Sequence, residues 1–259
     1  MRKDIEFIEI DGNIEGVVEP YEVERLIEEE KENLSIKKKK HIPTINSELR
    51  RRSVLVPEVI YECSGIIVLG RRIKSILFTT DIALITNNNA NAIMAVYPFT
   101  PSVSITQSIV ESASVPVFAG VGGGTTSGER SVHMALQAEL LGCYGTVVNA
   151  PMSNENISQI SKAIDVPVIA TIASLNDDID GKINAGAKIL NVAGGKNTAD
   201  IVSDIRKKVG KDFPIIATGG HEEQHILNTI KAGANAITYT PPTTGEIFES
   251  VMEEYRKKK

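Results

Sequence analysis

The chain has no tryptophan, only two cysteines, and 5% aromatic residues among its 259 residues. So few aromatic side chains argue against the stacking platforms on which proteins bind single-stranded nucleic acids. Cys63 and Cys143 lie far apart in the sequence. That spacing is typical neither of a disulfide framework nor of a zinc knuckle, and it indicates a reducing compartment.

The chain also lacks an excess of positive charge, since 28 Lys and Arg against 33 Asp and Glu give a net charge of −5. Proteins that bind nucleic acids usually show a basic excess or stripe. No apolar run approaches the roughly 20 residues of a membrane span. The first residues, Met-Arg-Lys-Asp-Ile-Glu, lack the apolar region of a signal peptide. We therefore expect a cytoplasmic protein with neither a nucleic acid nor a membrane as partner.

Residues 1–60 are richer in charge than the rest of the chain. They contain the acidic run Glu28-Glu29-Glu30 and a run of four lysines that ends at Lys40, and both runs are typical of a solvated surface. We interpret this segment as a charged helical arm or cap in front of a main domain over residues 61–259. The arm is also the feature that suggests a homo-oligomer.

The main domain contains short apolar, β-branched runs that alternate with segments of helical spacing. The runs cover residues 76–80, 93–97, 116–120, 145–149, 167–171, 188–192, 214–218 and 236–240. Their nearly continuous apolar character is typical of parallel strands that are buried on both faces. Residues 64–75 have the pattern of a hairpin with a Gly-Arg turn, which we expect to plug the bottom of a barrel.

The predicted strands come in repeating pairs. The first strand of each pair begins with proline, at Pro116, Pro167 and Pro214. The helix before the second strand ends in glycine, at Gly142, Gly186 and Gly233. Proline at the beginning of a strand removes no ladder hydrogen bond, and glycine suits the end of a helix. Four such pairs predict an α/β protein, a single (β/α)8 TIM barrel. An open doubly wound sheet is the alternative, but it does not predict the alternation.

The stretch Ile216-Ala-Thr-Gly-Gly-His, together with the following Ala232-Gly-Ala-Asn-Ala-Ile, resembles the phosphate-binding TIM barrels. It is most similar to the strand-7 region of 2-keto-3-deoxy-6-phosphogluconate aldolases, where a Thr-Gly-Gly turn helps to bind phosphate. The resemblance therefore implies a phosphate site at Thr218, Gly219 and Gly220.

Two features depart from that family. Its aldolases carry a Schiff-base lysine within strand 6, whereas here Lys188 stands at the beginning of that strand and Lys196 in the loop after it. Strand 8 usually ends in a glycine that lets phosphate approach, whereas here Pro241-Pro242 follows it. A Schiff-base aldolase is therefore not expected.

Small polar residues end six of the predicted strands, where the active site of such a barrel lies. They are Thr79 with Asp81, Asn149, Thr171, Asn191, Thr218, and Thr238 with Thr240. On most of these strands the residues of opposite parity are apolar, so the polar set predicts a hydrogen-bonding cup for a polar ligand. The alternative is that these side chains bind ordered water or cap loops.

Glycine-rich loops add backbone donors at the same end. Gly123 and Gly124 follow strand 3, and Gly219 and Gly220 follow strand 7. Glycine admits close backbone approach, and helix N-termini favour anions. We expect phosphate or carboxylate at Gly219 and Gly220, and we interpret the other loop as either a mobile lid or a second anion site.

Two short sequences are typical of capping boxes, in which Thr and Glu side chains satisfy amides at the beginning of a helix. They are Thr126-Ser-Gly-Glu129 and Thr243-Thr-Gly-Glu246. Each predicts a helix that begins at the mouth of the barrel, and Glu246 is accordingly interpreted as structural.

Three charged residues are candidates for catalysis. Asp81 is either a general base or the N-cap of the next helix. Lys196 either neutralises an anion or moves a proton, and otherwise it is a solvated loop residue. His221 is an acid, a base or an anion contact, or else a helix-start residue. No metal site is expected, because His221 and His225 lack the metalloprotease motif.

These features predict a metabolic enzyme for a small anionic, phosphorylated polyhydroxy substrate, a lyase or isomerase that works by proton transfer. Asn149, Thr171, Asn191 and Thr240 would hold hydroxyls or a carbonyl. No cofactor is expected. The alternatives are an FMN-dependent oxidoreductase, against which Pro241-Pro242 counts, a hydrolase that uses an activated water, and a non-catalytic ligand-binding barrel.

Overall fold

The structure is a computed structural model that describes residues 43–45, 47, 54–220 and 222–257. The chain divides into two units, Met1–Asn46 and Ser47–Lys259. In the first unit only residues 43–45 are described, and they are exposed and without regular secondary structure. The charged runs of the predicted helical arm lie outside the described residues.

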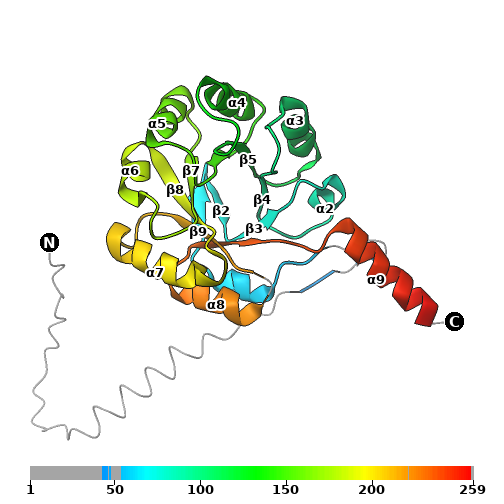
Figure 1. Ribbon diagram of the computed structural model, residues 1–259. Helices are drawn as coiled ribbons and strands as arrows, with labels where there is room; N and C mark the ends of the chain where they lie inside the picture. Colours follow the sequence, from blue (N-terminus) through cyan, green and yellow to red (C-terminus); the bar gives the residue numbers. More distant parts are fainter. Residues whose placement is uncertain (1–42, 46, 48–53, 221, 258–259) are drawn as a thin grey trace, which may run out of the picture. The chain divides into compact units, whose positions relative to one another are not determined.

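Eight parallel strands close into a barrel in the order in which they follow along the chain (Figure 1). They are β3 (Ser75–Phe78), β4 (Ala92–Ala95), β5 (Val117–Gly122), β6 (Gly145–Val148), β7 (Val168–Ile172), β8 (Ala187–Val192), β9 (Ile215–Thr218) and β10 (Ala236–Tyr239). The predicted TIM barrel is confirmed, and each strand lies where an apolar run predicted it.

Helices connect the strands and surround them (Figure 1). They are α2 (Ile82–Thr86), α3 (Val103–Ser112), α4 (Glu129–Leu140), α5 (Asn154–Ala163), α6 (Ile179–Asn184), the 3-10 turn η3 (Gly195–Asn197), α7 (Thr198–Val209) and α8 (Glu223–Lys231). The last helix, α9 (Thr244–Lys257), extends away from the barrel and has no buried residue. None of the described helices is long and apolar enough to cross a membrane.

Alternating side chains on the strands form two apolar clusters, as the pleat of a β-strand requires. The outer cluster packs the strands against the helices and includes Val148, Ala170, Val192, Ala217 and Ile237. The inner cluster fills the barrel and includes Phe118, Ile169, Ile189 and Ile216. The polar residues at the ends of β6 to β10 therefore have the parity of the barrel interior, as predicted.

A hairpin contributes to the inner cluster from outside the barrel sheet. Strands β1 (Ile66–Val68) and β2 (Arg71–Ile73) pair antiparallel around Leu69 and Gly70. Ile66, Val68 and Ile73 are buried in the inner cluster. They are followed directly by β3, so the hairpin lies at the N-terminal end of the barrel, where the sequence predicted a plug.

The unit that contains the barrel begins at Ser47, whereas the sequence composition predicted a main domain that begins at residue 61. The Val54 amide donates to the Asn87 carbonyl at 2.8 Å. Val56 and Ile60, the latter in the 3-10 turn η2 (Glu58–Glu62), belong to the outer cluster. The apolar side chains in this segment therefore pack with the barrel rather than in a separate arm.

Candidate active site

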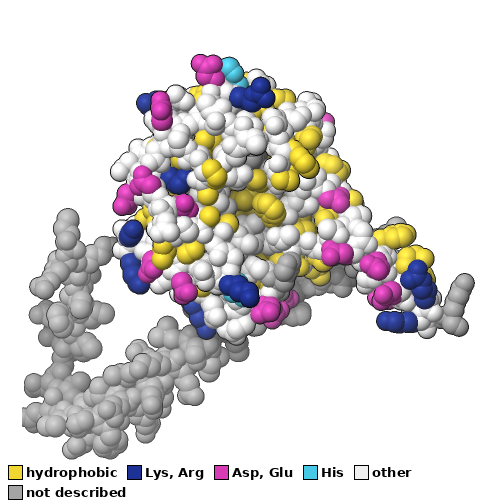
Figure 2. All heavy atoms as spheres, in the orientation of Figure 1, with side chains coloured by type: hydrophobic (Ala, Val, Ile, Leu, Met, Phe, Trp, Pro, Cys, Tyr) yellow, Lys and Arg dark blue, Asp and Glu magenta, His cyan; other side chains and the backbone are white. Residues whose placement is uncertain are grey.

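A cavity of about 180 Å³ opens in the barrel interior at the C-terminal ends of the strands. It is lined by Phe78, Met94, Val96, Val147, Asn149, Thr171, Asn191, Ala193, Thr218, Thr238 and Thr240. None of these residues is charged. The face of the molecule seen in Figure 2 is hollowed near its centre, where hydrophobic side chains gather, and most charged side chains lie toward the periphery.

One wall of the cavity is polar. Asn149, Thr171, Asn191, Thr218 and Thr238 come from or directly follow five consecutive strands, β6 to β10. Thr171 on β7 is the ladder partner of Asn191 on β8, and Thr218 on β9 is the ladder partner of Thr238 on β10. Ladder partners lie about 5 Å apart across parallel strands. The structure thus brings together the polar residues that the sequence predicted on these strands.

The opposite wall is apolar, which differs from the prediction for the first barrel strand. Phe78, not Thr79 or Asp81, faces the cavity from β3. Ile76 and Phe78 have interior parity, so Thr79 and Asp81 fall on the other side. The Thr79 hydroxyl accepts a hydrogen bond from the Asp81 amide at 3.1 Å. Thr79 therefore belongs to the turn after the strand and not to the cup.

Asp81 caps helix α2, which was one of its two predicted roles. Its Oδ1 accepts from the Ala83 amide at 2.8 Å, and its Oδ2 accepts from the Thr244 hydroxyl at the beginning of α9. The hydrogen bond from Thr244, followed by those from the backbone, lowers the pKa of Asp81. A carboxylate with a lowered pKa is a weaker base.

A wider, open cavity of about 680 Å³ adjoins the first and shares Thr218 with it. It is lined by Gly195, Lys196, Thr218, Gly220, Glu222 and His225. Lys196 projects from the short turn η3 after β8. His225 lies in the first turn of α8. The open cavity therefore places charged and titratable side chains beside the barrel-interior cavity, which is lined by no charged side chain.

The predicted anion turn after β9 is only partly open to a ligand. The Gly219 amide donates to the Thr238 carbonyl at 3.1 Å, so it is already used within the barrel. A Cβ at Gly219 would lie 2.6 Å from Cγ2 of Ile237, which explains the glycine by packing. Gly220, with a φ of +70°, lines the open cavity. His221 lies outside the described residues.

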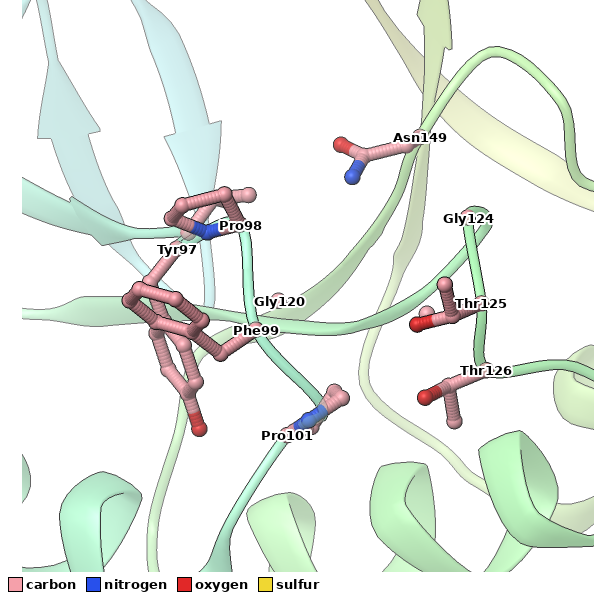
Figure 3. Close-up of a pocket in the computed structure, with 11 residues that line it drawn as sticks. Tyr97, Pro98, Phe99, Pro101, Gly120, Gly124, Thr125, Thr126 and Asn149 are labelled. Carbon is pink, nitrogen blue, oxygen red and sulfur yellow. The ribbon is translucent and has the colours of Figure 1, made fainter.

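The glycine-rich loop after β5 borders a third, small cavity of about 60 Å³. Figure 3 shows Thr125 and Thr126 on one side of it and the loop from Tyr97 to Pro101 on the other, with the Asn149 amide pointing between them. Gly124 lines this cavity.

Gly123 packs directly on the backbone of the β6–α5 connection. A Cβ at Gly123 would lie 2.6 Å from the Asn149 nitrogen, and its φ is +109°. The loop after β5 thereby supports Asn149 from behind, and only glycine fits this close approach.

The two predicted capping boxes have different outcomes. The box at α9 is confirmed, because the Thr243 amide donates to Oε2 of Glu246 at 2.7 Å and the Glu246 amide donates to Thr243 Oγ1 at 3.2 Å. The box at α4 is wrong. Gly128 is the N-cap there and provides no side-chain cap. The helix begins at Glu129, so Thr126 lies two residues before the N-cap position that a capping box requires.

Sequence reasoning missed the apolar wall and two polar groups near the site. Met94 lies on β4 and Val96 just after it, two positions apart. Residues two positions apart on a strand share a face, so this spacing could have predicted both in the barrel interior. His225 was considered only as a metal ligand. Lys182 is 4% exposed on α6 and donates to the carbonyls of Ala150 and Met152 at 2.9 and 3.3 Å. No sequence signal marked this buried lysine, because its partners are backbone atoms of another loop.

No protein-family model matches the chain, and no curated protein matches it. Solved structures do. A phosphonomutase of Burkholderia cenocepacia J2315 is 12% identical with a TM-score of 0.56, over 71% of this chain and 92% of that one. A 2,3-dimethylmalate lyase is 14% identical with a TM-score of 0.54, over 81% and 85%. The dihydrodipicolinate synthase DapA-2 of Bacillus anthracis is 17% identical with a TM-score of 0.51, over 64% and 69%. At these identities the likeness shows the barrel fold.

Proposed function

We propose that this protein is a metabolic enzyme of the lyase or isomerase type, and that it acts on a small anionic, phosphorylated polyhydroxy substrate by proton transfer. The observation that carries the proposal is the polar wall on β6 to β10, which meets the open cavity with Lys196 at Thr218. Converging polar groups in a barrel mouth are typical of an active site.

The names of the structural neighbours support a reaction of this class. They include a 2,3-dimethylmalate lyase, a phosphoenolpyruvate phosphomutase and a phosphonopyruvate hydrolase. Carbanions or enolates formed in such chemistry need hydrogen-bond donors at a carbonyl oxygen. The Asn149 amide and the threonine hydroxyls are donors that the cavity offers for this purpose.

Lys196 and His225 are the described residues that we assign to anion binding or proton transfer. Both line the open cavity, within the reach of a ligand that extends past Thr218. Asp81 is the weaker candidate, because its carboxylate is committed to the α2 cap and to Thr244. The roles predicted for His221 and for Gly220 as an anion contact remain predictions.

Magnesium does not fit the side chains of the barrel-interior cavity. One neighbour, a phosphonopyruvate hydrolase, was solved in complex with oxalate and Mg²⁺. Protein sites hold Mg²⁺ through one or more carboxylates. The barrel-interior cavity has none, and the described residues contain no group of three His, Cys, Asp or Glu side chains that could hold a metal ion.

A thermal-shift titration with inorganic phosphate and a panel of sugar monophosphates tests the proposal. A ligand at about 100 times its Kd stabilises a protein by about 2.7 kcal/mol, which is a shift of several degrees at this size. We expect a shift that Lys196→Met reduces and Lys188→Met does not, since Lys188 is exposed at the other end of the same strand. A flat response across the panel would contradict the proposal.

A further inference from the structure

Two buried polar atoms in the barrel-interior cavity have no hydrogen-bond partner among the described residues. They are Oδ1 of Asn191, which is 7% exposed, and Oγ1 of Thr238, which is 2% exposed. The amide nitrogen of Asn191 donates to Thr171 Oγ1 at 3.4 Å, which leaves its oxygen unpaired. Buried polar side chains are normally paired, so these two atoms indicate groups that a ligand satisfies.

The unpaired atoms restrict the chemistry of that ligand. An amide oxygen only accepts hydrogen bonds, whereas a threonine hydroxyl both donates and accepts. A ligand that satisfies Asn191 must therefore carry an O–H or N–H donor. A hydroxyl can satisfy both residues, while a methyl group satisfies neither.

The cavity also restricts charge. None of its lining residues is charged, and Phe78, Met94 and Val96 form one wall. A carboxylate or phosphate there would lose its hydration without a countercharge, which is strongly unfavourable. Lys196 lies in the adjoining open cavity, beyond Thr218. The two cavities thus divide the site into a neutral interior and an entrance that carries the charged side chains of Lys196 and Glu222.

We infer that the substrate enters the barrel with an uncharged end that donates a hydrogen bond to Asn191, and keeps its anionic group at the entrance beside Lys196. The enzyme is therefore specific for substrates with one anionic end and rejects those that are charged at both. This inference rests on the proposed function and deepens it by assigning each end of the substrate to a cavity.

Three probes of equal length test the inference, because they differ only at the end opposite the phosphate. Glycerol 3-phosphate ends in a hydroxyl, 1,2-propanediol 1-phosphate in a methyl group, and 3-phosphoglycerate in a carboxylate. Titrations of the full chain with ¹³C-methyl-labelled threonine report binding at Thr238. We expect 1,2-propanediol 1-phosphate to bind about tenfold more weakly than glycerol 3-phosphate, and 3-phosphoglycerate to bind the most weakly. Equal affinities, or tighter binding of 3-phosphoglycerate, would overturn the inference.

Variants show whether the unpaired atoms cause this preference. Thermal-shift titrations of the variants need no reporter at position 238. By this measurement we expect the tenfold preference for glycerol 3-phosphate to be lost in Asn191→Leu and in Thr238→Val. Thr146→Val is the matched control, since Thr146 is buried on β6 with an unpaired hydroxyl but does not line the cavity. A preference that survives in both Asn191→Leu and Thr238→Val, or disappears in Thr146→Val, would overturn the assignment.

Uncharged probes separate this inference from the proposed function. If none of the phosphates shifts the Thr238 methyl signal, but glycerol does and Asn191→Leu removes that shift, the phosphorylated substrate is wrong and the neutral interior stands. If neither glycerol nor glycerol 3-phosphate shifts that signal at ligand concentrations up to about 100 mM, the inference is wrong.

Discussion

Asn156 satisfies both backbone polar groups of Gly128 from the neighbouring helix. Its Oδ1 accepts from the Gly128 amide at 2.8 Å, and its Nδ2 donates to the Gly128 carbonyl at 3.2 Å. Asn156 is 3% exposed in the first turn of α5, and Gly128 is the N-cap of α4. One side chain thereby anchors the end of the glycine-rich loop that supports Asn149.

Replacement of Asn156 by leucine should loosen this loop. The change removes the partner of the Gly128 amide, whereas the Gly128 carbonyl still accepts from the Ser131 and Val132 amides. We therefore expect a loss of about 1 kcal/mol in the free energy of unfolding. Urea denaturation measures it. Asn154→Leu, two positions away at a half-buried site where the side chain has one partner, serves as control and should cost less. A comparable loss in both variants would contradict the anchoring role.

Alanine substitutions should distinguish two neighbouring glycines. Gly123→Ala places a Cβ 2.6 Å from the Asn149 nitrogen at a φ of +109°, whereas a Cβ at Gly124 meets nothing within 4 Å. We expect Gly123→Ala to destabilise the fold by more than about 2 kcal/mol and to shift the NMR signals of Asn149. Gly124→Ala should stay within about 0.5 kcal/mol of the parent chain. Equal effects would mean that Gly123 does not pack on Asn149.

Substitutions at Asp81 separate its structural role from a catalytic one. Asp81→Ala removes the α2 cap and should cost about 1 kcal/mol, while Asp81→Asn retains a good N-cap. If the carboxylate also serves as base, Asp81→Asn abolishes turnover at unchanged stability. Activity equal to that of the parent chain would exclude this catalytic role. Circular-dichroism melts and turnover of the substrate found in the ligand screen are the two measurements.

The hydrogen bond from Thr244 makes the contribution of Asp81 to the free energy of unfolding depend on pH. The folded-state pKa of Asp81 lies below its ordinary value of 3.8. Its contribution is therefore present above that value and is lost as the pH falls through the folded-state pKa. Denaturant melts of the parent chain and Thr244→Val should differ at pH 6 and converge in acid. A difference that stays constant as the pH falls from 6 into the acid range would show another cause.

Lys182 should affect stability in the same pH direction as Asp81, but in the alkaline range. Burial lowers its pKa from 10.5, and Asp177 and Asp178 only partly offset this. The unfolded chain therefore binds more protons below pH 10.5, and the free energy of unfolding rises with pH in that range. Lys182→Met lacks this pH-dependent contribution. The free energy of unfolding of the variant should therefore fall further below that of the parent chain between pH 7 and 10. Urea denaturation at both values measures it, and an unchanged deficit would contradict a charged, desolvated lysine.

Both cysteines should be inert in the folded protein. Burial raises the pKa of Cys63 and of Cys143 to about 12, and the thiolate is the reactive form. We expect a thiol reagent at pH 8 to label neither residue in native protein and both after denaturation. Rapid labelling of either one in the native state would contradict the burial described for that residue.

Much of the site could be predicted, because alternation on a strand is a local property. Apolar Val148, Ala170 and Ala217 marked the outer face of their strands, so the interior parity of Asn149, Thr171 and Thr218 followed. On the first strand the same reasoning was wrong. Thr79 and Asp81 are two positions apart like residues on one face, but Asp81 caps a helix and Thr79 binds its amide. Polarity at a strand end does not distinguish a ligand contact from a turn.

The sequence by itself determined the eight strands and their parallel order, since periodicity and repeats record these features locally. Only the tertiary structure decided which polar atoms lack partners. Thr146 and Thr238 are both buried strand threonines with unpaired hydroxyls, but only Thr238 lines the cavity. That difference depends on barrel closure and on loops distant in sequence, because partners and cavities are made by residues that only the fold brings together.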